Sequence, residues 1–514
     1  MSLRGSTAGR LLCGAAPPAL LVAFFLVVAG PGAAPGASGS GAAPSASGSG
    51  AAPSASGSGA APGAAGSGAA PGRQGLERAK RPPLHRCNLG ARRPFRCGHV
   101  MVPALRGDPS PGKQKVAFAL RGRRERDRPS LGTIVAVEGG PGFAATDGPY
   151  ARSLIAALGP VLRRRELLLI DERGTGRSWA IDCPGLQKGL ISEQIATGEC
   201  ADQLGRRFAA YTSAEAADDI DVVRRSLGLG RVILYGDSYG TLEGQAYAVR
   251  HASALRGLIL DSAYPADDPY YRTLYPAFRT GMRIACRRSP QCSGNAFGRF
   301  RRVVDRFHAA GRRTGDLLGF ALEAGTLAPR SYLSLDQGDR RFLRDRPRRL
   351  NRLIAPGPPG FGDPHAFSYG LEIAVECNDY PLLWNPQTPI NERIRQLSAS
   401  VGRLPRKHFA PFTRREYLLS AEAHLTNCLT WPPPPAGGLE PLVPKGWRAP
   451  KSLPTLVLAG ELDDITSVRE ARQTARRFPS SRLYVVPNRG HVSSLYFPFV
   501  SPAVGVIRNF IRNH

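Results

Sequence analysis

The clearest chemical signal in the sequence is the pentapeptide Gly236-Asp237-Ser238-Tyr239-Gly240, a match to the G-x-S-x-G pattern. It directly follows the apolar run Val232 to Tyr235 and precedes a helical stretch. Glycines two positions before and after a serine permit the strained strand-to-helix turn that exposes a nucleophilic hydroxyl. The N-terminus of the following helix favours negative charge beside it. This context predicts that Ser238 is a nucleophile, rather than an ordinary turn serine.

A serine nucleophile needs a base, and the base needs an orienting carboxylate. After an elbow of this kind the acid comes next along the chain and the histidine last. Asp463 and Asp464 follow the apolar run Thr455 to Leu458, and His491 follows a run that ends at Val486. We predict His491 as the base and Asp463 as the acid. Asp464 is the alternative acid, because two neighbours on one loop cannot both face the imidazole.

A glycine-rich loop, Glu138-Gly139-Gly140-Pro141-Gly142, follows another apolar run. Glycines there let a backbone N–H approach the substrate oxygen, so this loop and the Tyr239 N–H are predicted to form an oxyanion hole. Gly140 is the predicted donor from the loop. A tight structural turn is the alternative interpretation.

Short apolar runs rich in branched residues alternate with helical stretches. Such runs are typical of buried strands in a mostly parallel sheet, and strand–helix–strand alternation predicts an α/β fold. A helix is predicted over Thr212 to Leu227, where Ser213 and Glu215 stand near a capped start. The predicted strands are Val116 to Leu120, Thr133 to Val137, Leu167 to Ile170, Val232 to Tyr235, Leu255 to Leu260, Thr455 to Leu458 and Leu483 to Val486.

The alternation stops after Asp261 and resumes near Pro454. We interpret residues 266–450 as a large, mainly helical lid inserted into a catalytic domain formed by residues 76–265 and 451–514. An insertion between two strands leaves the sheet intact and covers the carboxyl ends of the strands, where open α/β sheets bind ligands.

Four segments together resemble the prolyl iminopeptidase and tripeptidyl aminopeptidase family of α/β-hydrolases. They are the glycine-rich loop, Asp171 to Ser178, the serine elbow, and Gly460 to Asp463 with Gly490-His491. The resemblance implies the α/β-hydrolase fold and places the catalytic acid at Asp463. It also implies an aminopeptidase activity, with a carboxylesterase or lipid hydrolase as the alternative on the same residues.

The lid segment Ala374 to Asp379 resembles a segment of the exported tripeptidyl-type members, and Cys428 resembles its partner cysteine. The resemblance implies that Glu376 and Asp379 hold the α-ammonium of the substrate, which needs negative charge when buried. Pairing with a surface arginine is the alternative. In the family, His or Asn-Pro usually precedes the glycines of this loop, whereas here Val137-Glu138 takes that place. Glu138 is predicted either to fix the loop or to sense the amine of the substrate.

Residues 1–34 have the pattern of an export signal: Arg4 and Arg10, then an apolar stretch, then small residues. If uncleaved, the same stretch could serve as a membrane anchor. Residues 35–75 are poor in charge and in large apolar groups, and prolines recur every nine residues within Gly, Ala and Ser. This composition predicts a disordered stalk, unless the repeat has no role.

Eight cysteines remain after Cys13, and an even number in an exported chain indicates disulfides. Metal binding is disfavoured because no cysteine pair has the two-residue gap of a zinc knuckle. Proximity in sequence, with the last pair by elimination, predicts Cys87 with Cys97, Cys183 with Cys200, Cys286 with Cys292, and Cys377 with Cys428.

The formal charge of the 514-residue chain is +29, and arginine provides 62 of its 69 basic residues. Such a surface attracts any polyanion, so association with an anionic cell-envelope polymer is a possible further role. Scattered arginines without an aromatic-interleaved motif do not indicate specific nucleic-acid binding, and GC-rich codon usage also enriches arginine.

The sequence therefore predicts a secreted or cell-envelope serine hydrolase, an aminopeptidase that needs no metal or organic cofactor and acts on peptides or small esters. A non-enzymatic basic surface protein is the alternative from another class.

Overall fold

The structure is a computed structural model that describes residues 81–267, 274–292, 294–355, 360–418, 426–435, 438–439 and 441–514. The predicted export signal, the whole predicted stalk and the first five residues of the predicted catalytic domain lie outside these residues. None of the helices in the described ranges is long and apolar enough to cross a bilayer.

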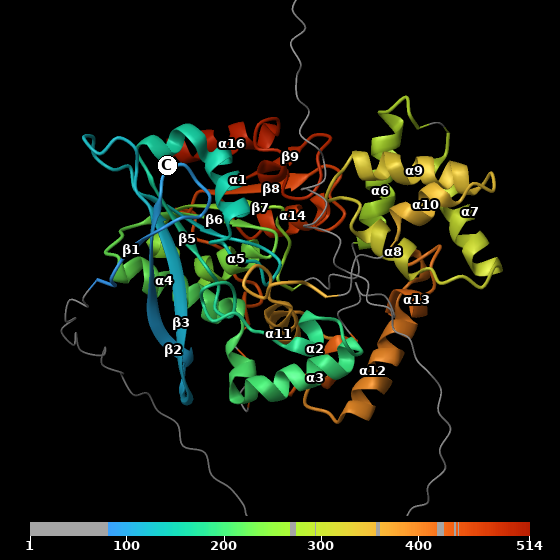
Figure 1. Cartoon of the computed structure of the whole chain (residues 1–514), viewed down its shortest axis with the longest axis horizontal. Helices are drawn as coiled ribbons and strands as arrows, with labels where there is room; N and C mark the ends of the chain where they lie inside the picture. The colour runs from blue at the N-terminus through green and yellow to red at the C-terminus, as the bar shows by residue number, and fades with distance from the viewer. Residues whose placement is uncertain are drawn as a thin grey trace, which may run out of the picture. The chain divides into compact units, whose positions relative to one another are not determined.

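The described residues form one nine-stranded sheet with the order β1-β2-β3-β5-β4-β6-β7-β8-β9 (Figure 1). The strands from β4 to β9 pair in parallel, whereas β1, β2 and β3 join the β5 edge through antiparallel pairs. Their bounds are β1 (His85–Cys87), β2 (Phe95–Leu105), β3 (Asp108–Arg121), β4 (Thr133–Val137), β5 (Glu166–Ile170), β6 (Val232–Asp237), β7 (Leu255–Asp261), β8 (Thr455–Gly460) and β9 (Ser481–Val486).

Helices cover both faces of the sheet, so its central strands are apolar on both sides. Alternate residues of β4 point into two different hydrophobic clusters: Val135 lies in one cluster and Ile134 in the other. The first cluster includes residues of α4 (Ser213–Ser226), α5 (Gly240–His251) and α14 (Val468–Ala475). The second includes residues of α1 (Gly148–Leu158) and α16 (Pro502–Asn513). Two-sided burial explains why these strands appear in the sequence as continuous apolar runs.

The chain between β7 and β8 is mainly helical and has two parts. The first part has its own hydrophobic cluster, which includes Phe278, Phe300 and Tyr332. It contains α6 (Leu274–Arg287), α7 (Ala296–Ala309), α8 (Gly315–Leu322), α9 (Arg330–Phe342) and α10 (Arg348–Leu353), which lie together in Figure 1. The second part contains α11 (Tyr369–Asp379), α12 (Ile390–Arg403) and α13 (Arg414–Leu418). Residues of α11 such as Leu371 and Val375 belong to the first hydrophobic cluster of the sheet. Residues of α2 (Pro184–Gln187) and α3 (Glu193–Leu204) belong to the same cluster.

All seven predicted strands are present, and the predicted mostly parallel sheet with a helical insertion is confirmed. The helix predicted over Thr212 to Leu227 is α4, whose first turn is capped by the Thr212 side chain accepting from the Glu215 N–H. The four predicted disulfides are also those of the structure. Asp336 lies near Cys286 and Cys292, but both sulfurs are in a disulfide and are not thiolate ligands.

Candidate active site

Ser238 lies in the turn between β6 and α5 with a φ of +51°, in the left-handed region that a non-glycine residue adopts only under constraint. Its amide N–H donates to the Asp261 carbonyl at 2.9 Å, which fixes the turn to β7. Gly236 packs directly against the Gly240 carbonyl, so no side chain fits there. The glycines of the pentapeptide therefore do what the pattern predicts: they allow a tight turn that presents the serine.

The structure brings Ser238, His491 and Asp463 into one line of hydrogen bonds. His491 Nε2 lies 2.9 Å from Ser238 Oγ, and His491 Nδ1 lies 3.0 Å from Asp463 Oδ2. The other Asp463 oxygen accepts from the backbone N–H groups of Ile465 and Thr466 at 3.0 and 2.9 Å. These contacts hold the carboxylate so that Oδ2 faces the imidazole, which is the geometry of a nucleophile, a base and an orienting acid.

Asp464, the alternative acid, points away from His491. Its carboxyl accepts from the Gly325 N–H at 2.6 Å and from the Tyr332 hydroxyl at 2.9 Å, both from the chain between β7 and β8. Burial raises the pKa of Asp464 well above its usual value. Asp464 therefore joins the inserted helices to the β8 loop.

The environment of His491 favours its protonated form. Burial lowers the pKa of the imidazole, but the charge of Asp463 and its hydrogen bond outweigh this effect, so the pKa lies above the ordinary 6.5. His491 is 6% exposed, and Asp463 is 4% exposed. A base that gains stability on protonation suits a reaction in which it takes the serine proton.

The glycine-rich loop lies against the nucleophile. A Cβ on Gly139 would lie 2.7 Å from Ser238 Cβ, and Gly140 has a φ of +117°, which glycine adopts readily. The Asp237 carboxyl holds the loop, because it accepts from the Gly139 amide and from the Tyr150 hydroxyl. Burial raises the pKa of Asp237 to about 7. Gly139 thus lies directly against Ser238 and near the Tyr239 amide, whereas Gly140 packs on Gly142 and Phe143 of its own loop, and its role as oxyanion donor stays a prediction.

The carboxyl of Glu138 is enclosed beside this loop. Burial, with the neighbouring charge of Asp237, raises its pKa well above the usual value, and Glu138 Oε2 has no hydrogen-bond partner among the described residues. No hydrogen bond from the described residues to Oε2 fixes the loop, and a bound ammonium ion would itself favour ionisation of the carboxyl, so both predicted roles stay predictions.

The two predicted lid carboxylates lie on α11. Asp379 Oδ2 accepts from the Ser213 amide at 2.7 Å and from the Ser213 hydroxyl at 2.6 Å, rather than from an arginine. Glu376 is 4% exposed, one turn earlier on the same helix. The Cys377–Cys428 disulfide joins this helix to the 3₁₀ turn Asn427–Thr430.

Sequence reasoning missed a buried acidic group behind the nucleophile. Glu172, which follows β5, contacts the Tyr239 hydroxyl at 2.9 Å, and Glu243 of α5 is 1% exposed. Burial raises the pKa of Glu172 to about 8 and that of Glu243 well above its usual value. The only signal available was their position: Glu172 lies inside the Asp171 to Ser178 segment, and Glu243 lies five residues after Ser238.

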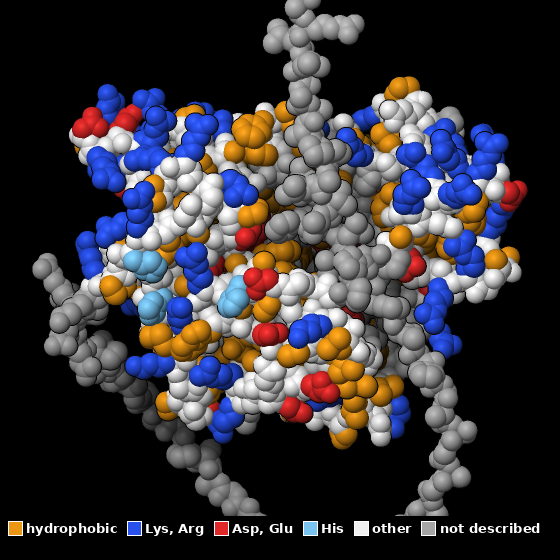
Figure 2. Space-filling view, in the orientation of Figure 1, with side chains coloured by type: hydrophobic (Ala, Val, Ile, Leu, Met, Phe, Trp, Pro, Cys, Tyr) orange, Lys and Arg blue, Asp and Glu red, His pale blue; other side chains and the backbone are white. Residues whose placement is uncertain are grey.

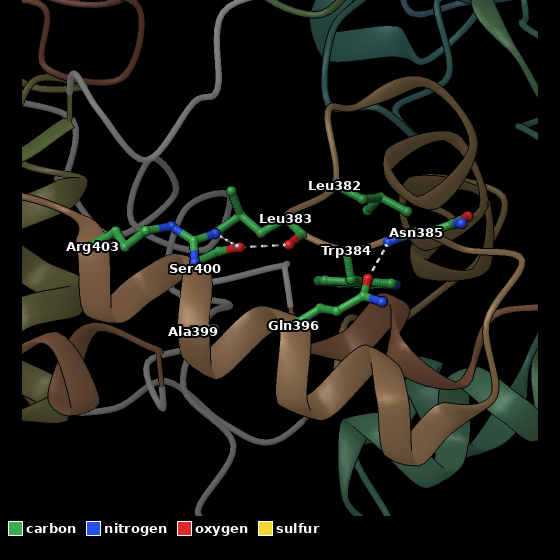
Figure 3. Close-up of a pocket in the computed structure, with 8 residues that line it drawn as sticks. All are labelled: Leu382, Leu383, Trp384, Asn385, Gln396, Ala399, Ser400 and Arg403. Atoms are coloured by element: carbon green, nitrogen blue, oxygen red, sulfur yellow. Dashed lines mark hydrogen bonds between the residues drawn. The ribbon is translucent and has the colours of Figure 1, made fainter.

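A pocket of about 520 Å³ lies on the inserted helices, between α12 and the segment that precedes it (Figure 3). Trp384 and Leu383 form its apolar wall, and Gln396, Ser400 and Arg403 line it from α12. It contains none of the predicted site residues, so it is separate from the Ser238 site.

The sequence profile of the family described as alpha/beta hydrolase fold matches residues 132–498. The chain belongs to the α/β-hydrolase fold family. The matched range contains Ser238, Asp463 and His491 together with the whole helical insertion.

Several curated proteins are similar to this α/β-hydrolase. The serine protease Hip1 of Mycobacterium tuberculosis is 26% identical over 449 residues, covering 75% of this chain and 80% of Hip1. A tripeptidyl aminopeptidase of Streptomyces coelicolor is 26% identical over 191 residues, covering 33% of this chain and 35% of that protein. Carboxylesterase B of M. tuberculosis is 26% identical over 397 residues, covering 69% and 73% of the two chains.

Among solved structures, a proline iminopeptidase of Mycobacterium smegmatis is 15% identical and covers 81% of this chain and 98% of its own, with a TM-score of 0.39. The predicted resemblance to the aminopeptidase family is confirmed by relatives from the same group, and this α/β-hydrolase is a serine hydrolase.

Proposed function

We propose that this protein is an exported aminopeptidase that releases one or a few N-terminal residues through an acyl-enzyme. The observation that carries the proposal is the line of hydrogen bonds from Ser238 through His491 to Asp463, at 2.9 and 3.0 Å. The similarity to a serine protease and to a tripeptidyl aminopeptidase supports a peptide substrate over other acyl compounds.

In this mechanism Ser238 Oγ attacks the scissile carbonyl while His491 Nε2 takes its proton. The negative oxygen of the tetrahedral intermediate rests on the backbone N–H groups of Tyr239 and Gly140, each donor typically worth about 3 kcal/mol. His491 then gives its proton to the leaving amine, and the released peptide departs. Water, activated by the same imidazole, hydrolyses the acyl-enzyme and restores Ser238. No step requires a metal or an organic cofactor.

An aminopeptidase must also recognise a free α-ammonium, and a buried ammonium needs a carboxylate partner. We assign this role to Glu376, which is buried on α11. Glu376 belongs to the Ala374 to Asp379 segment that resembles the exported tripeptidyl-type members, and Asp379 of the same segment contacts Ser213. Glu376→Gln is expected to raise KM for free-amine substrates and to leave KM for esters unchanged.

A carboxylesterase is the second candidate, because carboxylesterase B of M. tuberculosis is similar over 69% of this chain. The same nucleophile, base and oxyanion donors would serve an ester. The two functions differ in what holds the acyl portion of the substrate: a charged amine needs Glu376, whereas an ester does not.

Export is supported by the four disulfides, since thiols are oxidised outside the cytoplasm. An anionic envelope polymer is the proposed partner, and its binding surface is the arginine-rich group of helices α6, α7, α9 and α10. Residues 274–353 contain 18 arginines and six carboxylates, and Figure 2 shows basic side chains over these helices. Asp336 of α9 pairs with Arg299 and Arg340, but the arginines of residues 274–353 still outnumber the carboxylates by three to one.

Two measurements test these assignments. The first compares hydrolysis of aminoacyl, prolyl and tripeptidyl anilides with that of their N-terminally blocked forms and of short-chain esters. Cleavage of free but not blocked anilides, lost in Ser238→Ala, is the expected result; cleavage of esters alone would establish the carboxylesterase instead.

The second measures binding of inorganic polyphosphate against salt concentration. Replacing Arg341, Arg344 and Arg348 by serine should weaken it several-fold and reduce the salt dependence. Replacing the surface arginines Arg92, Arg96 and Arg126 is the matched control. Equal effects of the two triple variants would show that only net charge matters, without a binding surface.

A further inference from the structure

A buried line of hydrogen bonds joins the lid helix α11 to the residue that follows the nucleophile. Asp379 on α11 accepts from the Ser213 hydroxyl at 2.6 Å, and Ser213 Oγ lies 2.9 Å from the Tyr239 hydroxyl. The Tyr239 hydroxyl also lies 2.9 Å from Glu172 Oε1. Ser213 and Tyr239 are completely buried, so neither hydroxyl exchanges these partners for water.

The protons needed for this line of contacts can be counted. Three hydrogen bonds join four side chains, and the hydroxyls of Tyr239 and Ser213 supply only two protons. One of the two terminal carboxyls must supply the third. Burial raises the pKa of Glu172 to about 8, whereas that of Asp379 rises only to about 6, so near pH 7 the proton belongs to Glu172. Protons then run from Glu172 through Tyr239 and Ser213 to an ionised Asp379.

Fixing the Tyr239 side chain bears on two parts of the site, the oxyanion donor and the turn that carries the nucleophile. Its backbone N–H is the oxyanion donor in the proposed mechanism, and it directly follows Ser238, whose φ of +51° must be imposed by the surroundings. The ring is fixed at its far end by two hydrogen bonds and is fully buried along its length. A fixed ring leaves the Tyr239 backbone little freedom to rotate its N–H away from the substrate oxygen.

We infer that Glu172, Ser213 and Asp379 are positioning residues, which act through the Tyr239 side chain to hold the oxyanion donor and the nucleophile turn. Asp379 thereby links α11, a helix of the lid, to the reacting centre. This inference rests on the proposed Ser238 mechanism, but it does not depend on whether the substrate is a peptide or an ester. It assigns Asp379 to catalytic geometry and leaves recognition of the amine to Glu376.

The first experiment removes the Tyr239 hydroxyl. Tyr239→Phe is expected to lower kcat about tenfold on both a free aminoacyl anilide and an uncharged ester, with KM changed less than twofold. Tyr247→Phe is the matched control, because Tyr247 lies on α5, the helix that begins directly after Tyr239, and its buried hydroxyl donates to Asp221 at 3.0 Å, away from the nucleophile. The control should lose comparable thermal stability and keep its kcat. Equal kcat losses in both variants, or no loss in Tyr239→Phe, would overturn the inference.

The second experiment uses the neutral Glu172. Glutamine can form the same hydrogen bond to Tyr239 as a protonated carboxyl, whereas leucine cannot. Glu172→Gln should therefore keep at least a third of the kcat, and Glu172→Leu should lose about tenfold. Equal losses of kcat in Glu172→Gln and Glu172→Leu would show that a hydrogen bond from residue 172 to Tyr239 does not support catalysis. This pair decides the question even if Tyr239→Phe fails to fold.

The third experiment separates a positioning role of Asp379 from an amine-binding role. Asparagine keeps the oxygen that accepts from Ser213 but has no charge for an ammonium ion. Asp379→Asn should therefore change KM less than twofold on the free aminoacyl anilide and on the ester. Asp379→Ala should lower kcat about tenfold on both. A KM raised tenfold in Asp379→Asn on the anilide alone would overturn the inference. If the wild type cleaves no anilide, the aminopeptidase proposal fails, and the ester data still test the positioning residues.

Discussion

The neighbouring carboxyls of Asp463 and Asp464 have opposite environments, so replacing each by asparagine should give opposite results. In Asp463→Asn the side-chain oxygen must stay at the Oδ1 position, where the Ile465 and Thr466 amides donate at 3.0 and 2.9 Å. The new NH₂ group then occupies the Oδ2 position, 3.0 Å from His491 Nδ1. Because this group donates, Nδ1 must accept, and Nε2 carries the proton.

The wrong tautomer directs an N–H group at Ser238 Oγ, 2.9 Å away, so the imidazole cannot take the serine proton. Loss of this orientation costs about 10⁴ in kcat in enzymes with the same three groups, which corresponds to about 5 kcal/mol of transition-state stabilisation. The expected kcat of Asp463→Asn is therefore about 10⁴-fold below that of the wild type, with folding preserved.

Asp464→Asn is the matched control. Its oxygen can keep the Gly325 N–H, and its NH₂ can donate to the Tyr332 hydroxyl, which also donates to the Leu462 carbonyl at 3.0 Å. The hydrogen bonds are conserved, and kcat should stay within threefold. Steady-state kinetics on one anilide or ester, with thermal unfolding of each variant, provide the assay. An inactive Asp464→Asn beside an active Asp463→Asn would refute the reasoning.

Three further predictions concern the loop, the base and the lid. Gly139→Ala would place a Cβ 2.7 Å from Ser238 Cβ and should lower kcat at least 100-fold. In the control Gly230→Ala the new Cβ meets no atom within 4 Å, so kcat should not change. Similar kcat values for the two variants would contradict the close packing of Gly139 on Ser238. Because the pKa of His491 is raised above 6.5 and only the neutral imidazole accepts a proton, kcat/KM on an uncharged ester should fall with decreasing pH at a midpoint above 6.5. A midpoint below 6.5 would contradict this. Replacing Cys377 and Cys428 by serine opens a loop of 51 residues and should lower the free energy of unfolding by about 4 kcal/mol, which denaturant titration checks; an unchanged transition midpoint would contradict it.

The central strands could be predicted because they are buried on both faces, which leaves continuous apolar runs such as Leu167 to Ile170. The hairpin of β2 and β3 was largely missed for the opposite reason. Its exposed half includes Pro109, Pro111 and Gly112, which suggest a loop, and its residues alternate between buried and exposed. Tertiary pairing with β5 makes it part of the sheet.

The arrangement of Ser238, Asp463 and His491 was predictable because each follows a strand whose carboxyl end lies at the same edge of the sheet. The contact between Glu172 and Tyr239 could not be predicted, because no local sequence pattern indicates that both side chains are buried and face each other. The same limit applies to Asp379: the resemblance suggested an ammonium ligand, whereas its partner in the structure is Ser213, 166 residues earlier in the chain.

The most direct test of the central claim is covalent labelling with an aminoalkyl diphenylphosphonate, which bonds to an activated serine and carries a free amine. Peptide mapping of the purified protein should find the label on Ser238, and the rate should fall sharply in His491→Ala. The N-acetylated form of the same reagent should react much more slowly, since it has no ammonium to bind. Labelling at another residue would contradict the proposed nucleophile, and equal rates with both reagents would contradict the aminopeptidase.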